Sequence, residues 1–178
     1  SISARFFYFL VQKAATYRHA KEIHRRILSL DTHTDTPLDF DVSYNIGTRE
    51  KTQVCLPKMR EGKLDGQYLA CWVRQGPCDE ENSLKAIDRV DELIRHIYRQ
   101  VEMNGEQCAI ARTPDDLSRL KTEGKKAFYI GIENGYGISK DLKNITRFHD
   151  AVVTYITLCH TRNNDICDSS SDTTARWN

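Results

Sequence analysis

Residues 27–37 limit the choice of fold and chemistry more than any other segment of this 178-residue sequence. They form an apolar, strand-like run that stops at a His-x-Asp pair, His33 and Asp35, just before Pro37. Residues i and i+2 of a strand point to the same side, so the two side chains would converge as two ligands of one metal ion do. Pro37 cannot continue a central strand, which places the pair at a carboxyl end, where α/β folds carry their chemistry. The alternative for so short a motif is a His and an Asp that only cap a strand.

Two later apolar runs repeat this pattern. Residues 126–133 end in Glu133, which is followed by Asn-Gly, and residues 151–160 end in His160. Near-continuous apolar runs are typical of strands buried on both faces, as in a parallel sheet covered by helices. A single buried Glu or His is usually structural, but three strand ends in series that carry ligand-type side chains favour a metal site.

Helix and strand patterns alternate along the rest of the chain. We predict helices at 56–62, 83–103, 113–123 and about 140–149, further strands at 66–73 and 109–111, and a long loop at 39–53. The stripe of the longest helix that should face the core consists of Leu84, Ile87, Val90, Leu93, Ile94, Ile97 and Val101. Alternating strands and helices predict an α/β fold with parallel strands, either a barrel or a doubly wound sheet. No Gly-x-Gly-x-x-Gly or Walker-type loop follows any strand, which weakens a nucleotide-binding interpretation.

Composition and length restrict the partners. The length suits one domain with a sizeable core but is short for a closed eight-stranded barrel, which typically needs ~250 residues. Lys and Arg number 26 against 25 Asp and Glu, a net charge of +1, so no strong field favours nucleic acid. The apolar run 6–11 is far too short for a transmembrane segment. We expect it to belong to an amphipathic N-terminal helix at 1–26, the remnant of a targeting segment being the alternative.

The six cysteines show no C-x-x-C spacing, which excludes zinc-ribbon and thioredoxin-type sites. They are Cys55, Cys71, Cys78, Cys108, Cys159 and Cys167. Their even number is compatible with a disulfide from Cys55 or Cys71 to Cys78. Periplasmic or secreted and cytoplasmic locations both agree with this composition.

These motifs resemble those of the membrane (renal-type) dipeptidases, which are metallo-dipeptidases of the amidohydrolase superfamily. Asp31-Thr-His33-Thr-Asp35-Thr-Pro37 corresponds to the family's Asp-Gly-His-Asn-Asp-Leu-Pro, and residues 56–67 correspond to its Leu-Pro-x-Met-Arg-x-Gly-x-x-Gly-x-Gln. Gly131-Ile-Glu133-Asn-Gly135 and Tyr155-Ile-Thr-Leu-Cys-His160-Thr-Arg-Asn163 match Gly-x-Glu-Gly-Gly and Tyr-Leu-Thr-Leu-Thr-His-x-x-Asn. The motifs follow one another in order and at sensible spacings.

The resemblance implies a (β/α)8 TIM-type barrel whose complete active site holds two Zn2+ ions. His33 and Asp35 would hold one ion, and Glu133 would bridge both. His160 would face the substrate and stabilise the developing oxyanion rather than bind metal. The implied reaction is zinc-dependent hydrolysis of a small dipeptide by a metal-activated bridging water. A homo-oligomer is compatible with this family.

Departures from the family pattern shape the remaining expectations. Thr32, Thr34 and Asn134 stand where the family has Gly, Asn and Gly. The family's two further metal-binding histidines, its Arg for the substrate carboxylate and its late-barrel Asp lie in a second half of the barrel. We therefore expect residues 1–178 to be a single domain and the N-terminal half of a metallo-dipeptidase barrel, a fragment that is inactive alone. Its parts would be the helix at 1–26, barrel strands and helices at 27–160, and a loop at 161–178.

Two other functions remain open at this point. One is a non-catalytic truncated half-barrel, which an unpaired edge strand at 65–73 or 151–160 would favour. The other is an amidohydrolase of a different substrate class, since metal ligands constrain the reaction more tightly than the substrate.

Overall fold

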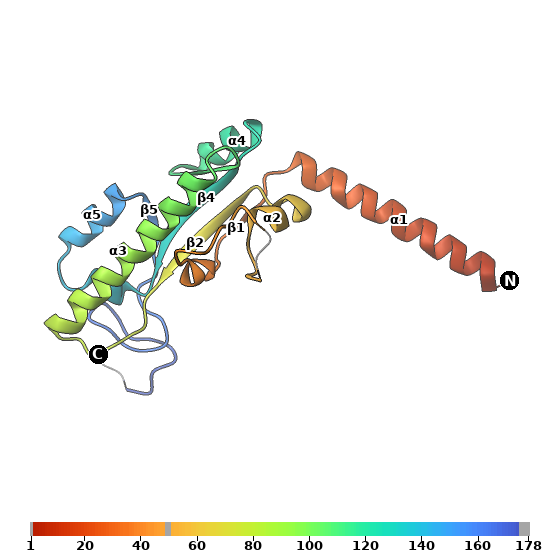
Figure 1. Ribbon diagram of the computed structural model, residues 1–178. Helices are drawn as coiled ribbons and strands as arrows, with labels where there is room; N and C mark the ends of the chain where they lie inside the picture. The colour runs from red at the N-terminus through yellow and green to blue at the C-terminus, as the bar shows by residue number, and fades with distance from the viewer. Residues whose placement is uncertain (1, 49–50, 175–178) are drawn as a thin grey trace.

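The core of the protein, in this computed structural model, is a parallel five-stranded sheet. Figure 1 shows how the helices are arranged around it. The structure describes residues 2–48 and 51–174, with side chains from residue 11 onward. The strands are β1 (Leu30–Asp31), β2 (Gly66–Trp72), β3 (Cys108–Ile110), β4 (Lys126–Glu133) and β5 (Val153–Ile156). All pairings are parallel, which confirms the predicted α/β class.

Strand β4 organises the sheet. It pairs with the whole of β2, from Gly66 opposite Ala127 to Trp72 opposite Glu133. Its other edge is shared, because β3 pairs with its amino-terminal part and β5 with its carboxyl-terminal part. Since β2 lies between β1 and β4, segment 65–73 is not an open edge. Among the described residues β5 pairs with β4 alone, so its outer side is open.

Helices connect the strands and cover the sheet. They are α1 (Ile2–Arg26), the 3-10 helix η1 (Thr36–Asp39), α2 (Leu56–Gly62), α3 (Glu80–Met103), α4 (Pro114–Thr122), the 3-10 helix η2 (Gly135–Ile138) and α5 (Lys143–Asp150). In Figure 1, α3 runs along the sheet and α1 extends away from it. The predicted helices at 56–62 and 113–123 are confirmed, and a capping box at Thr113 and Asp116 begins α4.

Helix α3 packs its apolar face into the main core, but it differs from the prediction in two ways. It begins three residues early, because the Asp79 side chain accepts a hydrogen bond from the Asn82 backbone N at 2.8 Å and caps the first turn. Its central apolar residues, including Leu93 and Ile97, are buried in the same core as Ile130 of β4.

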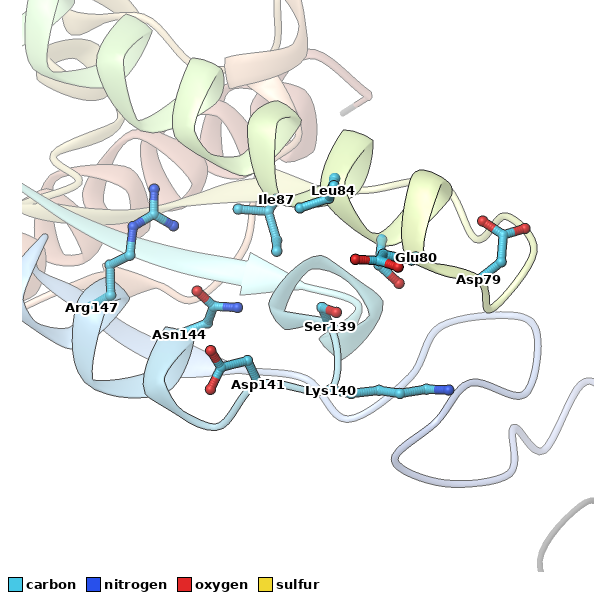
Figure 2. Close-up of a pocket in the computed structure, with 10 residues that line it drawn as sticks. Asp79, Glu80, Leu84, Ile87, Ser139, Lys140, Asp141, Asn144 and Arg147 are labelled. Atoms are coloured by element: carbon cyan, nitrogen blue, oxygen red, sulfur yellow. The ribbon is translucent and has the colours of Figure 1, made fainter.

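Leu84, which was predicted to face this core, is 57 % exposed instead. It borders a pocket of about 540 Å³ between α3, α5 and residues 139–141, in which Figure 2 shows it beside Ile87. Leu84 therefore lies at this pocket and not in the core, although it belongs to the predicted stripe. Ile87 and Val101 are only partly buried.

The face of the sheet opposite α3 carries a layer of tyrosines, on the same side of β4 as Glu133. The ring of Tyr68 stacks on that of Tyr129 at 4.9 Å and lies 5.1 Å from that of Tyr155. Residues alternate between faces along a strand, so Tyr129, Gly131 and Glu133 point the same way. Gly131 makes room for this layer, because an added Cβ would lie 2.1 Å from the Tyr155 ring.

Two predicted strands are much shorter than their apolar runs. Run 27–37 forms a strand only at Leu30–Asp31, because the Asp31 carboxylate accepts from the His33 backbone N at 3.1 Å and turns the chain. Run 151–160 forms a strand only at Val153–Ile156. Beyond that point, side chains of the following loop occupy the backbone carbonyls, as Ser169 Oγ does for the His160 carbonyl at 2.6 Å. In both places a side chain replaces the ladder bonds of a strand.

Helix α1 has the predicted position, whereas most of the apolar run on which the amphipathic prediction rested, residues 6–10, lies outside the side chains that the structure describes. All described side chains from Val11 to Arg26 are exposed except that of Glu22, which is partly buried and pairs with Arg25 at 2.8 Å. Among the described residues no helix has both the length and the apolar character needed to cross a membrane. All six cysteines are free thiols, so the suggested disulfides to Cys78 are not formed.

Candidate metal centre

His33, Asp35 and Glu133 meet at the carboxyl ends of the strands. One ligand atom from each lies within 4.8 Å of the other two. His33 Nε2 is 3.3 Å from Asp35 Oδ1 and 3.4 Å from Glu133 Oε2. The structure thus brings together the three side chains that the sequence predicted as ligands, although they come from segments about 100 residues apart.

His33 and Asp35 converge by a turn rather than by a strand. Both lie after β1, where the Thr34 carbonyl still accepts from the Ala70 backbone N of β2 at 3.0 Å and holds the segment against the sheet. Thr34 itself is buried, and its hydroxyl bonds to that of Thr36 at 2.9 Å. Asp35 then precedes η1, whose first turn contains the proline. Strand alternation correctly predicted that the His33 and Asp35 side chains converge. It wrongly predicted that both residues belong to a strand.

Glu133 is the last residue of β4, and its side chain is 16 % exposed. Its two carboxylate oxygens point to different histidines, because Oε2 faces His33 and Oε1 lies 3.5 Å from His160 Nε2. A carboxylate placed in this way can bind two partners at once.

Asn134 fixes the backbone directly after Glu133. It is fully buried and has φ +86°, a conformation that Asn adopts more readily than most residues. Its backbone N donates to Thr157 Oγ1 at 2.8 Å, and its side-chain Nδ2 donates to the Val73 carbonyl at 3.0 Å. Its Oδ1 accepts from Asn164 Nδ2 at 3.2 Å. One amide side chain therefore joins the ends of β2, β4 and the loop after β5.

His160 lies four residues beyond β5, not at the end of that strand as predicted. Its side chain is 37 % exposed, and its ring meets the Trp72 ring edge-on at 6.0 Å. It is close to Glu133 but does not belong to the compact set of three ligand atoms.

Tyr155 contacts the candidate centre through His33. Its hydroxyl is 3.5 Å from His33 Nδ1, which leaves His33 Nε2 to face the two carboxylates. Burial, followed by the nearby Glu133 carboxylate, raises the pKa of Tyr155 to about 12, so its phenol is neutral at pH 7. A fixed partner on the second ring nitrogen is typical of metal-binding histidines.

The donor set suits a zinc ion. It offers one imidazole nitrogen and two carboxylates, and Zn2+ accepts both at bonds of about 2.0–2.2 Å. In a tetrahedral site such bonds place neighbouring ligand atoms about 3.3–3.6 Å apart. The two distances from His33 Nε2, 3.3 and 3.4 Å, fall in or next to this range.

Sequence reasoning did not identify Tyr155, Trp72 or the role of Asn134. Tyr155 and Trp72 sit within apolar runs, where nothing distinguishes a residue that supports a site from one that fills a core. Asn134 carried a usable signal, because an Asn between a glutamate and a glycine suits a position with positive φ.

Comparisons with known proteins agree with this geometry. The family model described as Membrane dipeptidase (Peptidase family M19) matches residues 17–177. Dipeptidase ataJ from Aspergillus terreus is 28% identical over 171 residues, which are 89% of this chain and 42% of that protein. The crystal structure of the probable dipeptidase PvdM from Pseudomonas aeruginosa is 29% identical with a TM-score of 0.77, over 86% of this chain and 40% of that one.

A more distant structure shares the fold. It is a metallo peptidase from Rhodobacter sphaeroides, liganded with a phosphinate mimic of the dipeptide L-Ala-D-Ala. It is 16% identical with a TM-score of 0.66, and the match covers 78% of this chain and 47% of that one. The chain thus spans about two fifths of the length of the first relatives it matches.

Proposed function

This chain belongs to the membrane dipeptidase family, peptidase family M19, and from this premise we propose that it carries part of a zinc-dependent active site that hydrolyses dipeptides. The observation that carries the proposal is the convergence of the His33, Asp35 and Glu133 ligand atoms within 4.8 Å. These residues lie at the carboxyl ends of parallel strands, the end of such sheets that holds active sites in α/β barrels.

Within the proposed site, His33 and Asp35 would hold one zinc ion, and Glu133 would be shared between it and a second. Two bound zinc ions would supply a nucleophilic water of lowered pKa and would polarise the scissile carbonyl. The opposed directions of the two Glu133 oxygens support the bridging role. Asn134 and Tyr155 act as positioning residues, since Asn134 fixes the backbone after Glu133 and Tyr155 orients the His33 ring.

His160 donates a hydrogen bond to the oxygen of the scissile carbonyl as negative charge develops there. Two features support this role: the ring is partly exposed, and it stands at the edge of the proposed centre against Trp72. A positioned donor of this kind acts mainly in the transition state.

The proposed substrates are dipeptides. The support comes from the relatives, two of which are named as dipeptidases, and from the fold shared with a peptidase whose ligand mimics L-Ala-D-Ala. Both L,L- and L,D-dipeptides are therefore suitable probes.

A matched pair of substitutions tests the proposal. In the zinc-loaded protein that contains this sequence, Asp35→Asn should lower both zinc content and dipeptide hydrolysis. Asp39→Asn, the same change four residues away on an exposed side chain, should leave both unchanged. Zinc is measured by elemental mass spectrometry, and hydrolysis by release of free amino acids from L-Ala-D-Ala and L-Ala-L-Ala. Equal effects of the two substitutions would contradict the metal assignment.

One observation favours a second candidate, a non-catalytic half-barrel that pairs with another chain. Among the described residues the outer side of β5 has no strand partner, and such an edge is a template for pairing. Zinc binding without hydrolysis of either dipeptide, together with a stable complex on size exclusion, would favour this candidate over the dipeptidase.

A further inference from the structure

Two cysteines flank the loop that carries His160. Cys159 directly precedes His160, and Cys167 lies eight residues after Cys159 in the same loop. Both side chains are partly exposed free thiols. Neither belongs to the proposed metal centre, so their placement calls for a separate explanation.

Hydrogen bonds hold the two cysteine segments against each other. Asn164 Nδ2 donates to the Leu158 carbonyl at 2.8 Å on one side of the pair. Ser169 Oγ donates to the His160 carbonyl at 2.6 Å on the other side. Between them, the Cys159 thiol donates to the Asp168 carbonyl at 3.5 Å. The chain around Cys159 is thus tied, residue by residue, to the chain around Cys167.

The two cysteines lie on facing segments. Cys159 Sγ is 3.5 Å from the carbonyl oxygen of Asp168, the residue that directly follows Cys167. A disulfide requires Cβ atoms about 3.5–4.5 Å apart, and two chain segments held side by side by hydrogen bonds are placed to bring their cysteines to that separation.

The remaining cysteines differ in their surroundings. Cys55, Cys71 and Cys108 are buried to 1 % exposure or less, which shields them from dissolved oxidants. Cys78 is partly exposed, but it lies in the segment between β2 and α3 rather than in this loop. It therefore serves as a control for general thiol reactivity.

We propose that Cys159 and Cys167 are a redox modification site and form a reversible disulfide with a small disulfide oxidant such as oxidised glutathione. One cysteine thiolate attacks a sulfur of the oxidant, forms a mixed disulfide and releases one reduced glutathione. The second thiolate attacks the protein-side sulfur, forms the Cys159–Cys167 bond and releases the second glutathione. Two protein thiols are oxidised and one glutathione disulfide is reduced, and the two protons of the protein thiols pass to the two glutathione thiolates that are released.

The disulfide would restrain the loop next to the proposed active site. The loop contacts Asn134 through the fully buried Asn164, and Asn134 directly follows Glu133. A covalent link at Cys159 would keep the His160 backbone beside Ser169 even when the intervening hydrogen bonds open. The proposal does not depend on dipeptidase activity, because it concerns two thiols outside the metal set.

Tryptic mapping gives an unambiguous readout, because trypsin cuts after Arg147, Arg162 and Arg176. The products 148–162 and 163–176 each contain a single cysteine of the pair. The purified protein is equilibrated with oxidised glutathione, its remaining thiols are alkylated under denaturing conditions, and the digest is analysed without reduction. We expect the two peptides to appear joined in most molecules, in monomeric protein, and to separate after treatment with dithiothreitol.

Matched variants decide the outcome. Cys167→Ser should abolish the joined peptides, and Cys78→Ser should leave them unchanged, with circular dichroism confirming that both variants are folded. If Cys167→Ser does not fold, Cys159→Ser serves in its place. Native trypsin cleavage after the exposed Arg162 should also slow in the linked protein. Two separate glutathionylated peptides, or joined peptides found only in covalent dimers, would overturn the proposal.

Discussion

Glu133 and His160 face each other at the carboxyl end of the sheet, with Glu133 Oε1 3.5 Å from His160 Nε2. The other Glu133 oxygen faces His33, so one carboxylate lies between two histidines. The two histidines differ in their remaining contacts. His33 joins Asp35 and Tyr155, whereas His160 rests against Trp72 at the rim. This difference predicts different consequences when each ring is removed.

His160→Ala should lower kcat by about 10²–10³ while zinc content stays nearly intact, because the ring acts on the transition state and not on the metal. His33→Ala should instead lose zinc. His149→Ala, which removes an exposed imidazole from the end of α5, is the control for the loss of any histidine. The measurements are steady-state kinetics and metal analysis of the same preparations. Zinc loss in His160→Ala equal to that in His33→Ala would refute the division of roles.

Residues 1–178 expressed by themselves should show no measurable dipeptidase activity. His33, Asp35 and Glu133 offer three protein ligands to a pair of ions, whereas catalytic zinc commonly uses three per ion plus a water. The open side of β5 should also promote association. The check is an assay of several L,L- and L,D-dipeptides with added zinc, beside size-exclusion chromatography. Zinc-dependent turnover by a monodisperse monomer would contradict this expectation.

Asn134→Ala should destabilise the fold by about 2–3 kcal/mol, because it leaves the buried Val73 carbonyl without its partner. Asn134→Gly removes the same hydrogen bonds but accepts φ +86° without strain, so it should cost about 1 kcal/mol less. The comparison isolates backbone strain from lost bonds. Urea unfolding followed by circular dichroism measures both variants, and an alanine variant at least as stable as the glycine variant would contradict the strain argument.

Gly131→Ala should destabilise the protein by about 1–3 kcal/mol, because its new Cβ would lie 2.1 Å from the Tyr155 ring. The displaced ring should also lose its contact with His33, which NMR of the His33 imidazole would report. Gly62→Ala is the matched control. No atom lies within 4 Å of its added Cβ, and a helical Gly to Ala change stabilises by about 0.5–1 kcal/mol. Equal effects at the two glycines would rule out the close-packing explanation.

The cap of α4 should make a pH-dependent contribution. Asp116 accepts from the Arg112 and Thr113 backbone N at 2.9 Å each, and a hydrogen bond from Arg119, followed by these two bonds, lowers its pKa well below the ordinary value. A lowered folded pKa means that the stabilisation is complete above the ordinary aspartate pKa and is lost as pH falls through the folded pKa. Asp116→Asn should therefore cost about 1 kcal/mol at pH 7 and progressively less in acid.

Asp115→Asn provides the comparison for this cap, since Asp115 is exposed in the same first turn and makes no capping bond among those described. Thermal unfolding of both variants from pH 7 down to pH 2 measures the difference. A constant gap between Asp116→Asn and the parent protein across this range would exclude an ionised cap.

The sequence predicted those elements whose signals are local. The continuous apolar run of β4 gave its bounds, and the proline and first-turn acids of α4 gave its start. The meeting of His33 with Glu133 also followed from local patterns, because parallel strands place their carboxyl ends at one edge. Each of these properties depends on residues within a few positions of one another.

The errors arose where distant side chains decide the backbone. The apolar run to His160 looks like a strand, yet Asn164 and Ser169 occupy the carbonyls that a neighbouring strand would need. Leu84 follows the helical period of α3, but it lies at a pocket that α5 also lines. Hydrophobic periodicity reports which residues would prefer burial, and it does not report whether a partner is present.

The pairing of β2 with β4 joins the residues that lie farthest apart in sequence among the paired strands described. Its first rung joins Gly66 to Ala127, 61 residues apart, so a long loop has to close before the largest ladder of the sheet can form. Helix α3 and the α4 cap need only local contacts and can form earlier. The last rung joins Trp72 to Glu133. The position of Glu133 beside β2, and with it the candidate metal centre, therefore depends on a contact of high sequence separation, the class of contact that slows folding.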